Sequence, residues 1–321
     1  MPVSRKLVIN IVLTIAILLL LLGHHFILRG ELLSSARTAR VERKFHLLQT
    51  PPTPISRLDA VATASASALL SRSLSSTSAV AMDVATKKIL WQKNASAPNY
   101  PASTTKIITA LVARELYDLD DVIVIENQDL IYGQNVGWSA GDSVRVAEVL
   151  RALLILSANE AGMILADHAP GGYDAFITRM NAKAHELGLA QTRFVNPQGF
   201  DDDMQQVSAH DLALAALELL RDDFLREAVD TAQTTITTES GRTFALTNTN
   251  QLLTKTGLGY NVHGIKTGTT ALANEALVSL LEKNSHSIIV VVLSTNSRYN
   301  DTMKIADHVF GNYVWQPAVI N

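Results

Sequence analysis

Apolar residues follow three different patterns along the chain, and each pattern predicts a different kind of element. From Leu7 to Leu28 they form an almost unbroken run, close to the ~20 residues that a membrane-spanning helix needs. Short apolar runs at Ala79–Asp83 and Ile89–Trp91, separated by the turn Thr86-Lys87, predict a two-stranded hairpin. Between about residues 102 and 230, apolar positions recur at helical spacing, which predicts a helical middle.

The pattern changes back to strands after Gly264. Apolar stretches at 265–269, 276–281 and 287–293 predict three strands, and residues 300–315 predict a closing helix. Strands on either side of a helical block favour an α/β fold of the α+β kind, in which early and late segments share one antiparallel sheet.

The N-terminal part differs in composition from the rest. Basic residues precede the apolar run, as in anchors and in secretory signal peptides, but the nearest Ala-x-Ala pattern begins only at Ala64. We therefore expect residues 1–30 to be an uncleaved membrane anchor, with a cleaved signal as the alternative. Residues 31–77 mix charges with prolines and small polar residues, which is typical of a flexible linker. Residues 78–321 then form the globular domain.

Composition excludes several kinds of chemistry. The net charge of −3 gives no broad basic surface, so we do not expect nucleic acid as a partner. The absence of cysteine excludes a thiolate nucleophile and a cysteine-ligated metal. The sequence contains no His-Glu-x-x-His pattern, and no motif indicates a metal or an organic cofactor. No other short-range ligand spacing is formed by the histidines His168, His185, His210 and His263.

Ser103 and Lys106 lie three residues apart just after Pro101, where the pattern predicts the start of an apolar helix. Side chains at i and i+3 project from one helix face, so the lysine amine can reach the hydroxyl. A serine becomes nucleophilic when a base takes its proton, and a buried lysine with a lowered pKa can be that base. A helix cap followed by a solvated lysine is the alternative that this pattern leaves open.

Two later patterns also carry candidate binding groups. Ser157-Ala158-Asn159 falls between apolar helical stretches, where a hydroxyl and a carboxamide can point into a cleft. Lys266-Thr267-Gly268 falls in a predicted strand; lysine and threonine can hold a carboxylate, and glycine permits close approach. Each pattern has a second copy, at Ser294-Thr295-Asn296 and at Lys255-Thr256-Gly257. We select Lys266 because the other lysine copy is followed by a loop pattern.

In this order, the three patterns resemble those of penicillin-binding proteins and class A β-lactamases. Over about residues 78–313 the chain is similar to the low-molecular-mass D-alanyl-D-alanine carboxypeptidases. The segments that carry the resemblance are Pro101–Lys106, Phe194–Phe200 and Gly264–Thr269. The resemblance implies a β-lactamase/DD-peptidase-like fold: an antiparallel sheet of about five strands flanked by helices, with an inserted helical subdomain at about 102–230.

The resemblance also implies a role for each matching residue. Ser103 attacks the carbonyl between the terminal D-alanines of a peptidoglycan stem peptide, Lys106 accepts its proton, and water hydrolyses the acyl-enzyme. Ser157 relays a proton to the leaving D-alanine, while Asn159 binds the substrate backbone. β-Lactam antibiotics then act as covalent inhibitors. The implied carboxylate ligands are Lys266 and Thr267, and the implied oxyanion donors are the backbone N–H groups of Ser103 and Thr269.

The chain departs from the family pattern in two places. Ala158 and Glu160 stand where many relatives have glycine and aspartate, which leaves the cleft shape and the local charge in doubt. The chain ends at Asn321, before the C-terminal β-rich domain and anchor of several relatives. We therefore expect the N-terminal helix to replace that anchor and to hold the catalytic domain on the outer face of the cytoplasmic membrane.

Other functions remain as alternatives. Residues 137–141 match the Gly-x-Ser-x-Gly elbow of α/β-hydrolases, but no apolar strand precedes them, so we expect Ser139 to have no chemical role. On the same fold, a DD-endopeptidase, a β-lactamase or a non-catalytic peptidoglycan-binding scaffold is possible. A class A lactamase requires a loop with a water-holding glutamate that we do not find, and the intact motif residues argue against a scaffold.

Overall fold

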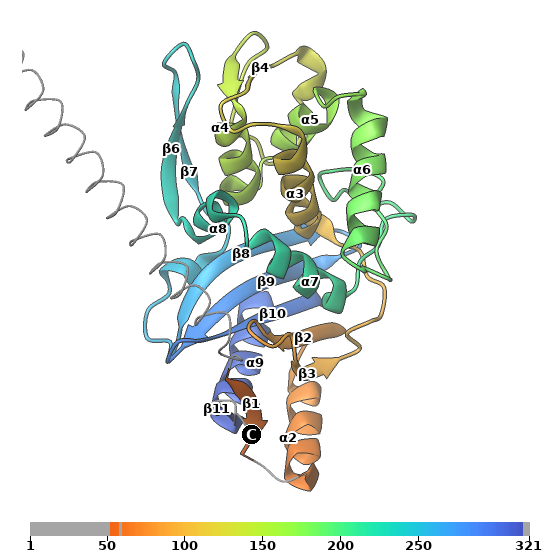
Figure 1. Cartoon of the computed structure of the whole chain (residues 1–321), viewed down its shortest axis with the longest axis vertical. Coiled ribbons are helices and arrows are strands. Elements are labelled where there is room, and N and C mark those ends of the chain that lie inside the picture. Colours follow the sequence, from red (N-terminus) through yellow and green to blue (C-terminus); the bar gives the residue numbers. More distant parts are fainter. Residues whose placement is uncertain (1–51, 58–59, 317–321) are drawn as a thin grey trace, which may run out of the picture. The chain divides into compact units, whose positions relative to one another are not determined.

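The computed structural model describes residues 52–57 and 60–316. The anchor expected at residues 1–30 therefore lies outside the described residues. Residues Thr53–Gln316 form one compact unit (Figure 1). Among the helices of this described part, none is long and apolar enough to cross a membrane.

A five-stranded antiparallel sheet lies at the centre of the unit, and it confirms the predicted mixed α/β fold. Its N-terminal strands form the predicted hairpin, and β2 (Ser78–Asp83) pairs with β10 (His286–Thr295), so that Val80 lies opposite Val291. The two ends of the domain thus meet in one sheet. In spatial order the strands are β3 (Ile89–Lys93), β2 (Ser78–Asp83), β10 (His286–Thr295), β9 (Asn274–Lys283) and β8 (Asn261–Thr270).

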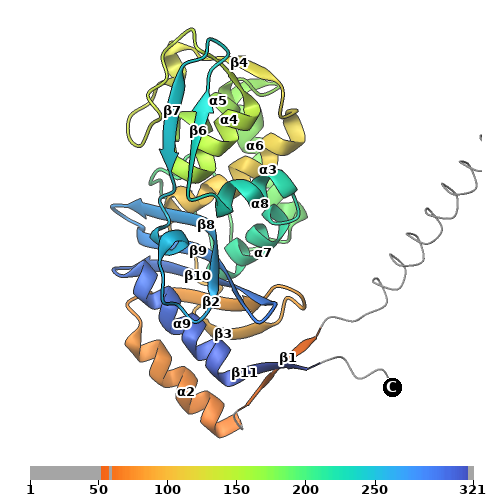
Figure 2. The same ribbon diagram turned by 90° about the vertical axis from the view of Figure 1, so that its left-hand side faces the viewer.

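The two faces of this sheet belong to two hydrophobic cores, because successive side chains of a strand point to opposite faces. On β10, Ile289 and Val291 belong to the core of the helical subdomain. Val290 and Val292 belong to a second core, which they share with helix α9 (Arg298–Asn312). Figure 2 shows α9 on the face of the sheet opposite to the helical subdomain. β10 is buried on both faces, and its run of β-branched residues fits that position.

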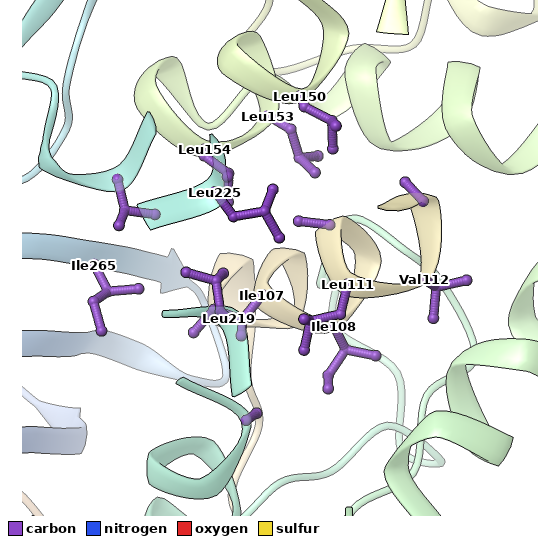
Figure 3. Packing of buried hydrophobic residues seen from close by; sticks show 14 of the residues in the cluster. Ile107, Ile108, Leu111, Val112, Leu150, Leu153, Leu154, Leu219, Leu225 and Ile265 are labelled. Atoms are coloured by element: carbon purple, nitrogen blue, oxygen red, sulfur yellow. The ribbon is translucent and has the colours of Figure 1, made fainter. Parts of the chain in front are cut away.

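The predicted helical middle is present between β3 and β8. Apolar side chains of its helices converge on a common core, where Ile107, Leu154 and Leu225 approach one another (Figure 3). A π-helical turn, Ala152–Leu156, extends α4 and ends at Ser157. The helices are α3 (Lys106–Leu116), α4 (Val146–Arg151), α5 (Asn159–Asp167), α6 (Gly172–Glu186), α7 (Ala209–Leu219) and α8 (Asp223–Asp230).

Two small hairpins accompany these helices and were not predicted. One joins β4 (Val122–Val124) to β5 (Ser143–Arg145), and the other joins β6 (Gln233–Thr237) to β7 (Thr243–Thr247). In the second hairpin each strand buries one residue, so the apolar alternation in the sequence is weak.

The described part of the predicted linker, 31–77, differs from the prediction. It contains strand β1 (Thr53–Ser56), which pairs with β11 (Tyr313–Gln316), and helix α2 (Ala60–Ser73). Alanine has the highest helix propensity, and Leu70 joins the second core, so an Ala- and Ser-rich segment forms a packed helix here. The closing helix α9 ends at Asn312, because the chain continues as β11.

Candidate active site

Ser103 lies in a short 3-10 turn, Ala102–Thr105, and Lys106 begins helix α3 directly after it. The Thr104 hydroxyl donates a 2.6 Å hydrogen bond to the Pro101 carbonyl and closes the turn. Ala102 has a φ of 47°, a left-handed conformation that costs a non-glycine residue about 1 kcal/mol or more. The turn therefore depends on the surrounding structure to hold Ser103 in place.

Two glycines allow that surrounding structure to approach the turn. A Cβ atom on Gly199 would lie 1.8 Å from the Ala102 carbonyl oxygen, and one on Gly268 would lie 2.9 Å from the Ala102 Cβ. Gly199 also has a φ of 89°, which favours glycine. The segment before Phe200 and strand β8 can therefore both contact the backbone of the nucleophile turn.

Lys106 is fully buried, and its amine has three acceptors. Nζ donates to Ser103 Oγ at 2.8 Å, to Asn159 Oδ1 at 2.8 Å and to the Gln198 carbonyl at 3.1 Å. Burial, assisted by the nearby charge of Lys266, lowers the pKa of Lys106 well below its ordinary value. A neutral amine within hydrogen-bonding distance of a serine hydroxyl can accept its proton.

Ser157 lines one side of the cleft, and Asn159 contacts Lys106 beside it. Ser157 is nearly buried and left-handed, with a φ of 66° at the end of the π-helical turn. Asn159 begins α5, and its side chain also donates to the Tyr132 carbonyl at 3.3 Å. The backbone N–H of Asn159 donates to the Gln134 carbonyl at 2.7 Å. The loop at residues 131–138 is thus attached to Asn159.

Glu160 is hydrogen-bonded to the same loop. In the sequence, this residue was noted only as a departure from the family pattern. Its buried carboxylate accepts the Val136 N–H at 2.7 Å and the Gly137 N–H at 3.3 Å. Burial raises the pKa of Glu160, while these backbone donors act in the opposite sense. The Glu160 carboxylate therefore holds the loop in place. Among the described residues, its hydrogen bonds go to this loop and not to Ser103.

Strand β8 lines the opposite side of the site. Lys266 is 1% exposed, and its Nζ donates to the Thr267 carbonyl at 3.2 Å. Burial and the charge of Arg298 lower the pKa of Lys266 to about 7. The hydroxyls of Thr267 and Thr249 lie 2.6 Å apart. β8 is an edge strand of the sheet, so one side of its backbone is not paired within that sheet.

Arg298 is a site residue that the sequence analysis missed. Its guanidinium donates to the Gly268 carbonyl at 2.9 Å and to the Thr269 hydroxyl at 2.6 Å, and it pairs with Glu275 at 3.2 Å. Its Nε is buried without a hydrogen-bond partner. In the sequence, Arg298 is marked only by its position just before the predicted closing helix. This position does not distinguish it from other arginines of the chain.

These elements enclose a cleft of about 530 Å³, which is lined by some of the predicted groups, whereas Lys106, Asn159 and Lys266 lie outside its lining. Gly268 and Thr269 contribute from β8, Ser103 from the turn and Ser157 from the helical side. The full lining is Ser103, Gln134, Ser157, Thr249, Gln251, Thr267, Gly268, Thr269, Glu275, Arg298 and Tyr299.

The competing motifs lie outside this cleft lining. Ser139 sits in a turn, where its N–H donates to Asp142 at 2.8 Å, and it has neither a strand before it nor a helix directly after it. The second lysine copy, 255–257, is exposed in a loop. In the second serine copy, Thr295 donates to buried Asp301 at 2.7 Å, a contact that fixes the end of β10. Over residues 52–57 and 60–316, no group of three or more acidic, histidine or cysteine side chains is placed to hold a metal ion.

Known proteins are similar to this chain in both sequence and fold. A Bacillus subtilis protein named D-alanyl-D-alanine carboxypeptidase DacF is 32% identical over 249 residues, which make up 75% of this chain and 63% of that protein. A Pseudomonas aeruginosa protein named D-alanyl-D-alanine endopeptidase is 32% identical over 235 residues, 72% of this chain and 74% of the relative. The crystal structure of the Streptomyces K15 DD-transpeptidase matches with a TM-score of 0.69 and 28% identity, covering 74% of this chain and 98% of that one.

The chain thus spans somewhat less than two thirds of the length of the Bacillus relative. The profile of one family, described as D-alanyl-D-alanine carboxypeptidase, matches residues 61–297 and so includes the turn of Ser103, the Asn159 segment and strand β8. The chain therefore belongs to the S11 peptidases, the D-alanyl-D-alanine carboxypeptidase family.

Proposed function

We propose that this protein is a serine-type D-alanyl-D-alanine carboxypeptidase, which removes the last D-alanine of peptidoglycan stem peptides through an acyl-enzyme on Ser103. One observation carries the proposal. The fully buried Lys106 places Nζ 2.8 Å from Ser103 Oγ, and its lowered pKa favours the neutral amine that a general base requires. Family membership supports the choice of substrate.

The acylation step uses this pair directly. Ser103 Oγ attacks the carbonyl carbon of the bond between the two D-alanines, and its proton passes to Lys106 Nζ. The carbonyl oxygen becomes an oxyanion, which the backbone N–H groups of Ser103 and Thr269 stabilise. When the peptide bond breaks, the leaving nitrogen takes up a proton relayed by Ser157. Water then attacks the ester and restores Ser103.

Cationic side chains bind the terminal carboxylate of the substrate. Lys266 and Thr267 were expected for this role, and Arg298 adds a guanidinium that lines the same cleft. The negative charge of a bound carboxylate favours the protonated form of Lys266, whose pKa is about 7 in the free protein. The cleft therefore favours a peptide with a free C-terminus, and a β-lactam carboxylate occupies the same place.

Endopeptidase action is a second candidate. The relative from Pseudomonas aeruginosa carries that name, and the match covers 74% of its length, compared with 63% for the carboxypeptidase DacF. Cleavage of a crosslinked peptide would use the same acylation by Ser103. The two activities differ in the leaving group, which is free D-alanine in one case and a second peptide in the other.

We also propose that residues 1–30 anchor the protein in the cytoplasmic membrane, with the catalytic domain on the outer face. The apolar run from Leu7 to Leu28 supports this proposal, and so does a peptidoglycan substrate, which lies outside that membrane. If the anchor is retained, the full-length chain stays in the membrane pellet after alkaline carbonate extraction. Release of a chain that lacks residues 1–30 would show a cleaved signal instead.

The function is tested with the full chain in detergent micelles, by measuring D-alanine release from diacetyl-L-Lys-D-Ala-D-Ala. We expect release by the unmodified protein and none by Ser103→Ala. Labelling by a fluorescent penicillin, measured in parallel, reports acylation of Ser103 independently of turnover. Labelling without release from this peptide, but with cleavage of a crosslinked dimer, would establish the endopeptidase. If the protein is not labelled by penicillin and also releases no D-alanine, both candidate functions are overturned.

A further inference from the structure

Thr249 lines the cleft, and the proposed mechanism gives it no role. Its hydroxyl oxygen lies 2.6 Å from that of Thr267, the β8 residue expected to hold the substrate carboxylate. Thr267 lines the same cleft and is 5% exposed. The contact therefore joins a residue without an assigned role to one of the proposed binding groups.

The backbone of Thr249 is hydrogen-bonded on both sides. Its N–H donates to the Ile155 carbonyl at 3.1 Å, and Ile155 belongs to the π-helical turn that ends at Ser157. Its carbonyl accepts a 2.9 Å hydrogen bond from the hydroxyl of Tyr299 on α9. Threonine is β-branched, which restricts rotation about its χ1 angle. The Thr249 hydroxyl is therefore held at a set position in the cleft.

Each of the two hydroxyls has a single proton to donate and two lone pairs that accept, so one of the two residues supplies the proton of their contact. An ionised carboxylate only accepts hydrogen bonds. If Thr267 gives its proton to the substrate carboxylate, the proton between the two hydroxyls comes from Thr249. A hydroxyl that accepts a hydrogen bond is polarised and becomes a stronger donor. Thr249 thus strengthens the bond from Thr267 to the carboxylate.

The hydroxyl of Thr269, which also lies on β8 in the cleft lining, is in a different situation. It donates its proton to the Gly268 carbonyl at 2.8 Å. Within residues 52–57 and 60–316, the contact with Thr249 is the only hydrogen bond of the Thr267 side chain. The Thr267 proton is therefore free for a ligand when Thr249 acts as the donor, whereas the Thr269 proton is already engaged.

We propose that Thr249 is a positioning residue, which donates a hydrogen bond to Thr267 Oγ1 and so directs the Thr267 proton toward the terminal carboxylate of the substrate. This inference rests on the proposed function, because the place of the carboxylate at Thr267 comes from it. Thr249 acts through Thr267 and takes no part in the bond-breaking step at Ser103. Its loss should therefore weaken carboxylate binding without disabling the nucleophile.

Benzylpenicillin and its methyl ester distinguish this role from general damage to the site, because the ester lacks the negative charge. The rate constant for acylation of Ser103 is measured with the full chain in detergent micelles, by residual labelling with fluorescent penicillin after timed incubation. Thr249→Val keeps the β-branched shape and removes the hydroxyl. We expect it to slow acylation by the free acid about five- to tenfold and acylation by the ester about twofold or less. Thr249→Ser keeps the hydroxyl and should recover most of the lost rate.

Thr235→Val is the matched control, since Thr235 is exposed on β6 and lies outside the cleft lining. It should keep the rates with both penicillins. Equal slowing of the free acid and the ester in Thr249→Val would mean that Thr249 only supports the shape of the cleft, and it would overturn the inference.

A double-mutant cycle tests whether Thr249 acts through Thr267. Thr267→Val should slow acylation by the free acid on the order of tenfold, since it removes the hydroxyl that binds the carboxylate. Thr249→Val, added to Thr267→Val, should then slow it by about twofold or less, because the group that Thr249 directs is already gone. If the two single losses multiply instead, the residues act independently and the inference is wrong.

Turnover of diacetyl-L-Lys-D-Ala-D-Ala gives a second readout. Thr249→Val should raise KM about fivefold and change kcat by about twofold or less, since the lost contact serves substrate binding. A fall in kcat at constant KM would contradict a binding role. If the penicillin rates respond as expected but the unmodified protein releases no D-alanine, the carboxypeptidase function fails while the role of Thr249 stands. If neither penicillin acylates the unmodified protein, both proposals fail.

Discussion

Lys106 Nζ lies 2.8 Å from Ser103 Oγ, and the lysine side chain is fully buried. Three neutral oxygen acceptors surround the amine, and within residues 52–57 and 60–316 no carboxylate pairs with it. A paired carboxylate would hold the lysine in its charged form, whereas these neighbours allow it to lose its proton. The roles proposed for Ser103 and Lys106 therefore depend on what surrounds the lysine as much as on their spacing in the sequence.

The pH profile of kcat/KM for the peptide should be bell-shaped. Activity rises with pH as Lys106 becomes neutral, since its pKa is lowered and only the neutral amine accepts a proton. It falls again above pH 7, because Lys266, with a pKa of about 7, loses the charge that binds the carboxylate. Steady-state rates across the pH range check this. A profile that still rises above about pH 8 would show that Lys266 stays charged in the working protein.

Replacing Glu160 should disturb the site through the loop at residues 131–138. Glu160→Ala leaves the Val136 and Gly137 N–H groups without their acceptor, and each of these part-buried hydrogen bonds contributes about 0.5–1.5 kcal/mol. We expect a lower melting temperature and a roughly tenfold slower acylation by penicillin, because Asn159 is bonded to the same loop. Glu160→Gln keeps one acceptor oxygen and should recover most of the rate. Equal losses in both variants would mean that the negative charge, and not the loop contacts, is needed.

Gly268→Ala should slow acylation at least tenfold, because its new Cβ would lie 2.9 Å from the Ala102 Cβ and would displace the nucleophile turn. Gly311→Ala is the matched control, since a Cβ there meets nothing within 4 Å and the residue lies on helix α9. It should keep the acylation rate and stabilise the fold by up to about 1 kcal/mol. Acylation by fluorescent penicillin and thermal unfolding measure both effects. Unchanged acylation in Gly268→Ala would show that β8 can move away from the turn.

Lys266→Met should stabilise the fold while it reduces activity. The pKa of Lys266 in the folded protein is about 7, below the ordinary value of 10.5, so folding disfavours the charged lysine. Between pH 7 and pH 10.5 the unfolded chain therefore binds more protons than the folded protein. Below pH 7 the full penalty applies, and the variant should gain about 1–2 kcal/mol in free energy of unfolding. The gain should shrink as pH rises toward 10.5. Denaturant unfolding of both proteins at several pH values tests this, and a gain that does not change with pH would contradict it.

Ser139→Ala provides a test of the competing motif. Ser139 sits outside the cleft lining, in the turn held by Asp142, so the variant should keep activity within about twofold of the unmodified protein. A loss of D-alanine release comparable to that of Ser103→Ala would move the nucleophile to Ser139.

Local patterns were sufficient for the strands of the central sheet, for the helical middle and for several candidate site residues. Strands β2, β3, β8, β9 and β10 were predicted because their apolar residues are continuous or alternate between two buried faces. Ser103 and Lys106 were recognisable because three residues on a helix bring two side chains to one face, a relation that exists before any tertiary contact. The hairpin of β6 and β7 and helix α2 bury few apolar residues, so their sequences carried a weak signal.

The sequence by itself determined the fold class, the family resemblance and the groups available for catalysis, because these depend on residue type and short-range spacing. Only the tertiary structure decided which groups meet. Lys106 and Asn159 are 53 positions apart, and Arg298 reaches Gly268 across 30 positions. Burial lowers the pKa of Lys106 and of Lys266, and burial is a property of the assembled cores, so no local pattern could predict either shift.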